Sequence, residues 1–323
     1  MKKFPLLILL FLLLLSACGG GDVPVDDHEH AGAMEPLTIP SLTPISEGKR
    51  PSIVATTSII GDVVAHVGGE AIDLTTLMAA GQDPHSYEPA AQELTAVSNS
   101  NIIFVNGWDL EENLVHSLES IGGDVPLVPV SAGIEPLAFN GNEDLADPHV
   151  WFDVANVKQW TTTIADSLTT IDPANAEIYA ANAAAYQAEL DELDDYVQSA
   201  MDSIPAENRH LVTNHGAFNY FANAYGVEVV GTVIPSMSAL AEPSAGEMAA
   251  LISLMNEQNI CAVFTETTLS DELAQTLAAE LDGCEETAVS KLYTGAIGSP
   301  DSGADSYISM MQANADTIAN GLK

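Results

Sequence analysis

A long helical segment near the middle of the chain limits the folds that the chain can adopt. Asp172-Pro173 is a typical helix start, with Asp as N-cap and Pro at the first helical position. Apolar residues then recur every three or four positions, no glycine interrupts them, and Pro205 ends the pattern. Residues 173–204 therefore predict one helix of about 48 Å. Its apolar stripe comprises Tyr179, Ala183, Tyr186, Leu190, Leu193, Val197, Met201 and Ile204, and its expected water-facing side is acidic (Glu189, Asp191, Glu192, Asp194 and Asp195).

On both sides of this helix, short β-rich runs alternate with helical stretches. Continuous Val/Ile runs separated by helices indicate parallel sheets that are covered on both faces. We therefore expect an α/β protein with two lobes, each with a four-stranded parallel sheet flanked by helices, joined by one long rigid α-helix. The expected strands are 52–57, 73–78, 101–106 and 127–130 in the first lobe, and 210–213, 227–233, 261–266 and 287–292 in the second.

The first residues indicate export. Residues 1–17 combine Lys2-Lys3 with a short apolar run, and "LSAC" ends at Cys18, which is typical of a lipoprotein signal peptide. Cleavage before Cys18 would place a lipid on its thiol, although an ordinary signal peptide with an incidental Cys is the alternative. The protein is then anchored by lipid to the cell membrane, on the extracellular face or in the periplasm.

The remaining boundaries follow from composition and periodicity. Residues 18–50 are rich in Gly, Pro and acid, which predicts a flexible acidic tether. We expect an N-terminal α/β lobe over 51–171, the linking helix over 172–205 and a C-terminal α/β lobe over 206–323. His28 and His30 in the tether suggest either a weak metal-collecting site or an acidic linker without a role in binding.

The charge of the chain excludes one class of partner. The sequence has 8 basic and 46 acidic residues, with a net charge of −38. Nucleic acid is therefore not expected as a partner, and we expect a monomer. The acidic surface is either a solvated coat or a field that attracts cations.

Two cysteines besides Cys18 precede or open expected strands. Cys261 and Cys284 would lie at the same end of two neighbouring parallel strands, so a disulfide between them is sterically reasonable in an exported protein. Two reduced, buried thiols are the alternative.

Three of the eight histidines lie in loops rather than in helices or at strand starts. His85 and His149 each follow Asp-Pro, and His215 follows the run "HLVTN". Ligands of open parallel sheets bind outside the carboxyl ends of the strands, and three imidazoles meeting there suit Zn²⁺. The same layout with an open position also occurs in zinc hydrolases, where Glu266 would serve as base. The sequence shows no local catalytic motif, and we do not expect an enzyme.

The residues around these histidines resemble a known family. "GQDPHSYEP", "DPHVWFD", "NHGAFNYF", "SALAEPSAGEM" and "ADSYISMMQANADTIANGL" occur in order from about residue 52 to the end. They resemble the metal-binding solute-binding proteins of ABC importers (cluster A-I), which include zinc- and manganese-uptake lipoproteins. The resemblance implies a metal held between two lobes by His85, His149 and His215, and delivery of the metal to an ABC permease with its ATPase. Three His ligands are more similar to the zinc members, so Zn²⁺ is expected as the transported ligand, with Mn²⁺ as the less favoured one; surface adhesion is reported across the family.

One position departs from the family pattern. Many relatives place an Asp ligand in a late loop, where this chain has Gly295 in "LYTGAIGSPDSG". The fourth position is then open to water, to Glu266 or to Asp301. Asp83 and Asp147 are expected either to accept hydrogen bonds from imidazole N–H groups or to cap their turns.

Overall fold

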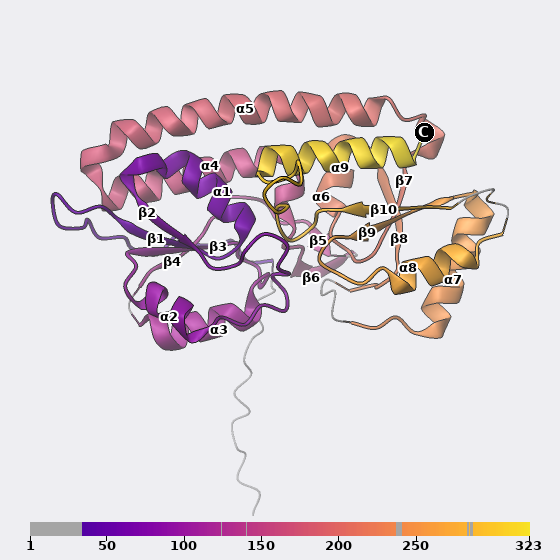
Figure 1. The fold of residues 1–323 in the computed structure, drawn as a ribbon, viewed down its shortest axis with the longest axis horizontal. Helices are drawn as coiled ribbons and strands as arrows, with labels where there is room; N and C mark the ends of the chain where they lie inside the picture. The colour runs from indigo at the N-terminus through magenta and orange to yellow at the C-terminus, as the bar shows by residue number, and fades with distance from the viewer. Residues whose placement is uncertain (1–33, 124, 140, 237–240, 283, 285–286) are drawn as a thin grey trace, which may run out of the picture. The chain divides into compact units, whose positions relative to one another are not determined.

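Two four-stranded sheets, each of parallel strands, form the framework of the fold (Figure 1). The computed structural model describes residues 34–323 except 124, 140, 237–240, 283 and 285–286. The described residues fall within one unit, Ala31–Lys323. The predicted signal peptide, Cys18, His28 and His30 lie outside the described residues. Within the described part of the chain, no helix has both the length and the apolar character needed to cross a membrane.

The first lobe has the strand order β2-β1-β3-β4, and all neighbouring strands are parallel. Its strands are β1 (Ser52–Ala55), β2 (Asp73–Thr76), β3 (Ile102–Val105) and β4 (Leu127–Pro129). Val54 and Ile103 pack against α2 (Ala91–Ser98) and α3 (Glu112–Gly122). Ile53 and Phe104 face the other side, toward α1 (Ser58–Gly68) and α4 (Val154–Ile171). Both faces of the sheet are thus covered, as predicted.

The second lobe repeats this plan with the order β10-β9-β7-β8. Its strands are β7 (His210–Thr213), β8 (Glu228–Thr232), β9 (Ala262–Glu266) and β10 (Ala288–Leu292). Val212 and Val263 pack against α7 (Ala245–Gln258) and α8 (Glu272–Ala279), while α6 (Asn219–Tyr225) and α9 (Tyr307–Gly321) contribute to the core on the opposite face. All eight predicted strands are present, most of them shorter by one or two residues at an end. Four 3₁₀ turns complete the described elements: Gly69–Ala71, Val150–Phe152, Pro173–Asn175 and Ala206–Asn208.

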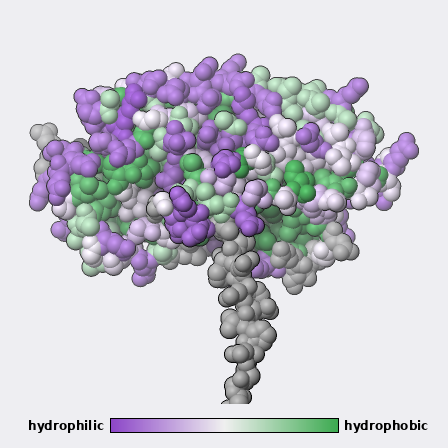
Figure 2. All heavy atoms as spheres, turned by 180° about the vertical axis from the view of Figure 1, so that it is seen from behind, coloured by the Kyte–Doolittle hydropathy of each residue, from purple (hydrophilic) through white to green (hydrophobic). Residues whose placement is uncertain are grey.

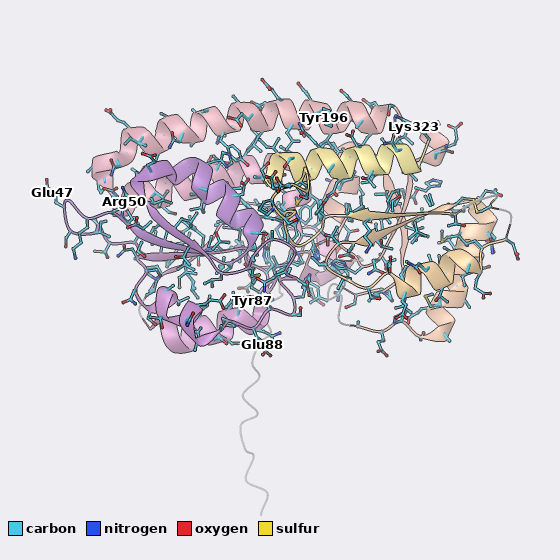
Figure 3. The ribbon with its side chains drawn as sticks, viewed as in Figure 1. Glu47, Arg50, Tyr87, Glu88, Tyr196 and Lys323 are labelled. Carbon is cyan, nitrogen blue, oxygen red and sulfur yellow. A yellow bond between two sulfur atoms is a disulfide. The ribbon has the colours of Figure 1, made fainter. Side chains whose placement is uncertain are left out.

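The predicted connecting helix is α5 (Ala176–Asp202), preceded by the 3₁₀ turn Pro173–Asn175. Every residue of its predicted stripe is buried. The stripe belongs to one hydrophobic cluster that also contains strand residues of both sheets and the buried side of α9. Figure 1 shows α5 running along both lobes with α9 beside it, and Figure 3 labels Tyr196 on α5, whose hydroxyl donates to Asp316 of α9 at 2.8 Å. The lobes therefore share a core instead of meeting only through a connector.

The outer side of α5 is polar. Glu189, Asp191, Glu192 and Asp195 are exposed, as predicted, and Asp194 is half-buried. Figure 2 shows hydrophilic residues along this edge of the molecule. Polar side chains on the face opposite the stripe keep α5 a surface helix.

Part of the expected tether contacts the first lobe. The N–H of Ile45 donates to the carbonyl of Ile171 at 2.8 Å, and the indole of Trp108 donates to the carbonyl of Glu35 at 3.5 Å. Leu37 and Leu42 are partly buried against the core. Residues 34–45 therefore differ from the freely flexible chain expected for 18–50, because several of their apolar side chains pack on the lobe. The domain boundary at residue 50 stays a prediction.

A short antiparallel hairpin was not predicted. It consists of β5 (Ala138–Phe139) and β6 (Asn142–Ala146), and it leads directly into Asp147. Its strands are too short and too polar to give a period-two pattern of apolar residues.

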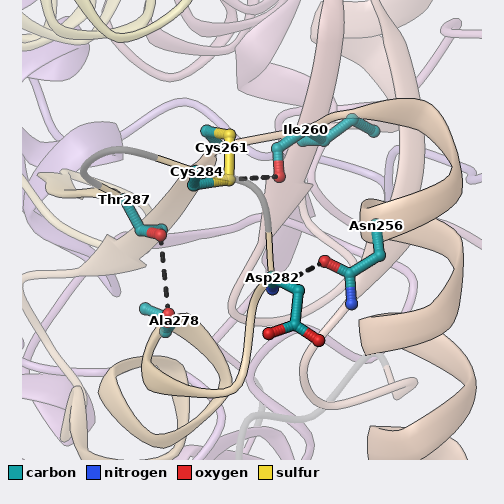
Figure 4. Close-up of a disulfide and its surroundings, with 7 residues drawn as sticks. All are labelled: Asn256, Ile260, Cys261, Ala278, Asp282, Cys284 and Thr287. Carbon is teal, nitrogen blue, oxygen red and sulfur yellow. Dashed lines mark hydrogen bonds between the residues drawn. A yellow bond between two sulfur atoms is a disulfide. The ribbon is translucent and has the colours of Figure 1, made fainter.

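The predicted disulfide joins Cys261 and Cys284, whose Cα atoms lie 5.7 Å apart (Figure 4). Cys261 immediately precedes β9, and Cys284 lies four residues before β10, so both lie at the amino end of the second sheet. A cross-link there closes the β9-α8-β10 unit.

We expect loss of this disulfide to destabilise the second lobe. The bond spans 23 residues, and closing a loop of this size in the unfolded chain corresponds to about 3 kcal/mol. The paired Cys261→Ser and Cys284→Ser variant should lose about this much unfolding free energy in chemical denaturation. Equal unfolding free energies for the wild type with and without reductant would contradict a structural role.

Candidate metal centre

Three histidine side chains converge between the two lobes. His85, His149 and His215 each offer one ring nitrogen, and these atoms lie within 4.8 Å of one another. The Nε2 atom of His149 is 3.2 Å from that of His85 and 3.3 Å from that of His215. Zn–N bonds of about 2.05 Å in a tetrahedron place two ligand nitrogens about 3.3 Å apart. The spacing of the imidazoles therefore fits a tetrahedral metal ion.

Each imidazole comes from a loop that follows a strand. His85 lies in the loop between β2 and α2, His149 follows β6, and His215 lies two residues after β7. His149 and His215 are buried, and His85 is half-buried. The carboxyl ends of parallel strands thus place His85 and His215, as the sequence predicted, whereas His149 follows the antiparallel hairpin β5-β6.

Asp147 orients His149. Its Oδ1 atom lies 2.8 Å from His149 Nδ1 and also accepts the backbone N–H of His149 at 3.0 Å. A carboxylate at Nδ1 holds the proton there and leaves the lone pair of Nε2 free for a metal. Asp147 therefore combines the two roles that the sequence left open, imidazole acceptor and turn cap.

Glu266 has the corresponding role for His215. Its Oε1 atom accepts a short hydrogen bond from His215 Nδ1 and the backbone N–H of His215 at 3.2 Å. The hydroxyl of Thr294 donates to Oε2 at 2.6 Å. Because both oxygens are occupied, Glu266 supports His215 from behind. Asp301, the other candidate for the fourth position, is exposed and is not part of the described cluster.

His85 is held differently. Asp83 Oδ1 accepts the backbone N–H of His85 at 3.3 Å, and its Oδ2 accepts the hydroxyl of Ser86 at 2.7 Å. These bonds cap the turn and do not reach the imidazole. Asn113 donates to the His85 carbonyl at 3.4 Å, so this loop is fixed mainly through its backbone.

The electrostatic surroundings of the imidazoles differ. Burial, with His149 and His215 nearby, lowers the pKa of His85 well below its usual 6.5. Burial also opposes charge on His215, but the Glu266 carboxylate outweighs it and raises the pKa of His215. The pKa of Glu266 is lowered because His215 and Thr294 outweigh its burial. A neutral His85 is ready to bind a cation without first losing a proton.

The loop that contains Gly295 packs against the first lobe. A Cβ atom at position 295 would lie 2.5 Å from Pro84 Cδ, which leaves no room for a side chain. The backbone N–H of Ile297, two residues later, donates to the Ser58 hydroxyl, and its carbonyl accepts from the N–H of Gly81, both at 3.2 Å. The space that a side chain at position 295 would need is therefore occupied by Pro84, in the loop of His85.

A third buried carboxyl group, which no sequence signal singled out, supports the site from a distance. Glu111 is 1% exposed and accepts hydrogen bonds from the Thr56 hydroxyl at 2.5 Å and the N–H of Asn106 at 2.9 Å. Asn106 in turn donates to the carbonyl of Pro148, next to His149, at 2.9 Å. Burial raises the pKa of Glu111 to about 7 even though these hydrogen bonds oppose the shift. Its sequence context, a helix start, gave no sign of burial.

The raised pKa of Glu111 predicts a pH dependence of stability. A folded-state pKa of about 7, above the ordinary 4.5, means that stability is lost as pH rises through this interval. Between about pH 5 and pH 8 the wild type should lose about 2 to 3 kcal/mol relative to Glu111→Gln, which does not titrate. Denaturation of both proteins across this range measures the difference. Parallel pH profiles would show that the carboxyl group titrates normally.

Fold and site together define a class of protein. The chain has two α/β lobes with parallel sheets, a core shared by both lobes, and three imidazoles that meet between them. This is the arrangement of the two-lobed metal-binding proteins that serve ABC importers. The family described as "Zinc-uptake complex component A periplasmic" matches residues 53–321. The chain belongs to this family, whose members are transport components and not enzymes.

Individual relatives differ in the metal that their names give. The manganese-binding lipoprotein MntA of Halalkalibacterium halodurans is 34% identical over 100% of this chain and 99% of its own length. The manganese ABC transporter substrate-binding lipoprotein PsaA of Streptococcus pneumoniae serotype 4 is 30% identical with the same coverage.

Two solved structures are similar in fold. The periplasmic zinc-binding protein TroA of Treponema pallidum has a TM-score of 0.78 and 31% identity, and covers 85% of this chain and 99% of its own. The Mn-bound periplasmic metal-binding protein of Candidatus Liberibacter asiaticus has a TM-score of 0.76 and 25% identity, with coverage of 84% and 99%.

Proposed function

We propose that the protein is the extracytoplasmic substrate-binding component of a metal ABC transporter, and that it captures Zn²⁺ with His85, His149 and His215. The observation that carries this proposal is the convergence of three imidazole Nε2 atoms at 3.2 and 3.3 Å. The converging set contains no oxygen atom among the described residues. Imidazole nitrogen suits zinc, whereas manganese prefers more oxygen ligands.

The buried carboxylates supply the charge that the ligands lack. Three neutral imidazoles leave the charge of a divalent cation uncompensated in a largely buried site. Asp147 and Glu266 are 0% and 2% exposed and contact two of the imidazoles at Nδ1. They would offset the charge of the ion through the rings, without direct coordination. This arrangement orients the ligands and keeps the ion exchangeable, as cargo requires.

The fourth coordination position is proposed for water. Glu266 is fully engaged by His215 and Thr294, Asp301 is exposed, and Pro84 excludes a side chain at Gly295. Zinc with three protein ligands and one water is chemically ordinary. An open position also gives the permease a place to offer a replacing ligand.

Membrane attachment and partners complete the proposal. The named relatives are lipoproteins, and Cys18 in "LSAC" provides a lipidation site. The protein would present its metal to a membrane permease that is driven by an ATPase. An additional adhesive role stays a prediction from the family resemblance.

Metal titration of the protein without its lipid tests this function. We expect zinc to bind more tightly than micromolar and to outcompete manganese. His85→Ala, His149→Ala and His215→Ala should each weaken zinc at least about 100-fold, more than the loss of an outer hydrogen-bond partner. His116→Ala, an exposed histidine on α3, is the matched control and should bind as the wild type does. Micromolar zinc affinity, or three variants that bind normally, would refute the proposal.

Gly295 provides a separate test of the site geometry. A methyl group at 2.5 Å from Pro84 Cδ must push the His85 loop away, so Gly295→Ala should weaken zinc about 10-fold. Gly246→Ala is the control, because a Cβ there meets only Ser244 Oγ at 3.8 Å. Competitive zinc titration of both variants measures the effect. Unchanged affinity in Gly295→Ala would show that the contact does not position His85.

A further inference from the structure

Helix α6 belongs to the second lobe, yet its polar side chains bond to the first. Asn219 Nδ2 donates to Asp147 Oδ2 at 2.8 Å, and the Tyr220 hydroxyl donates to the carbonyl of Asp147 at 3.1 Å. The Tyr220 hydroxyl also accepts the N–H of Leu137 at 2.9 Å. Two consecutive residues of α6 thus hydrogen-bond to Asp147, the residue that orients His149.

The carboxylate of Asp147 is divided between the lobes. Its Oδ1 atom faces the backbone and Nδ1 of His149, while its Oδ2 atom accepts from Asn219. Asp147 is 0% exposed, so an oxygen deprived of its donor would not be compensated by bulk water. Hydrogen bonds to both oxygens fix the plane of the Asp147 carboxylate. The orientation of that plane sets the position of Oδ1, which is the acceptor for His149 Nδ1.

Asn219 is also close in sequence to His215, the third imidazole of the site. It lies four residues after His215, and the intervening chain is buried at Ala217 and Phe218. The segment from His215 to Asn219 is therefore one packed piece of chain. It places His215 beside His149 and Asn219 beside Asp147.

We infer that Asn219 is a positioning residue. Through its hydrogen bond to Asp147, the second lobe holds His149 of the first lobe in its metal-binding orientation. This inference rests on the proposed function, since the orientation matters because His149 binds metal. With Asn219 in place, Nδ1 of His149 keeps its proton and Nε2 faces the other two imidazoles. Without it, the Asp147 carboxylate can rotate and release the ring.

The test combines zinc affinity with the tautomer of His149. Asn219→Leu keeps the size of the side chain and removes the donor, and it should weaken zinc about 10-fold. Nitrogen NMR of the metal-free protein should show His149 protonated at Nδ1 in the wild type and a mixture of tautomers in Asn219→Leu. Tyr196→Phe, which removes one hydrogen bond to Asp316 between α5 and α9, is the matched control and should change neither.

A double-mutant cycle separates positioning from general loosening of the lobes. In an Asp147→Ala background, Asn219→Leu should cause no further loss of zinc affinity. An equal loss with and without Asp147, or a wild-type tautomer in Asn219→Leu, would overturn the inference. If the wild type bound no zinc, the proposed function would fail, while the tautomer of the metal-free protein would still decide the role of Asn219.

Discussion

The hydrophobic core beneath α5 is the constraint on which the site depends. It joins strand residues of both sheets with the buried stripes of α5 and α9 in one continuous cluster. Because packed interiors deform little, the lobes are held at a nearly constant distance. Imidazoles from loops of different lobes are thereby held within hydrogen-bond distance of one another. The metal site is a product of this packing as much as of its own residues.

Much of the framework could be predicted from the sequence, because its signals are local and periodic. Apolar residues at every third or fourth position indicate the buried stripe of α5, and runs of Val and Ile indicate the strands. The three histidines were predicted from their loops and from the motifs around them, and the structure brings them together. The disulfide followed from the parallel arrangement of β9 and β10.

What the sequence could not predict depends on contacts between distant segments. Glu111 reads as an ordinary helix-start acid, and only the fold buries it against Thr56 and Asn106. Gly295 reads as a missing ligand until Pro84 is found against it. Asp147 and Asn219 are 72 residues apart, and no spacing rule links them. The short hairpin β5-β6 lacks apolar alternation, and residues 34–45 pack on the lobe through apolar side chains that follow no helical or strand period.

Strand β9 connects two features that were described separately. It begins next to the disulfide at Cys261 and ends at Glu266, the carboxylate behind His215. Five residues of extended chain span about 16 Å. One end of the strand is thus fixed covalently, and the other carries the carboxylate that accepts a hydrogen bond from His215. A bond that forms only in an oxidising environment therefore restrains the strand that carries Glu266, at the end of the strand opposite to that carboxylate.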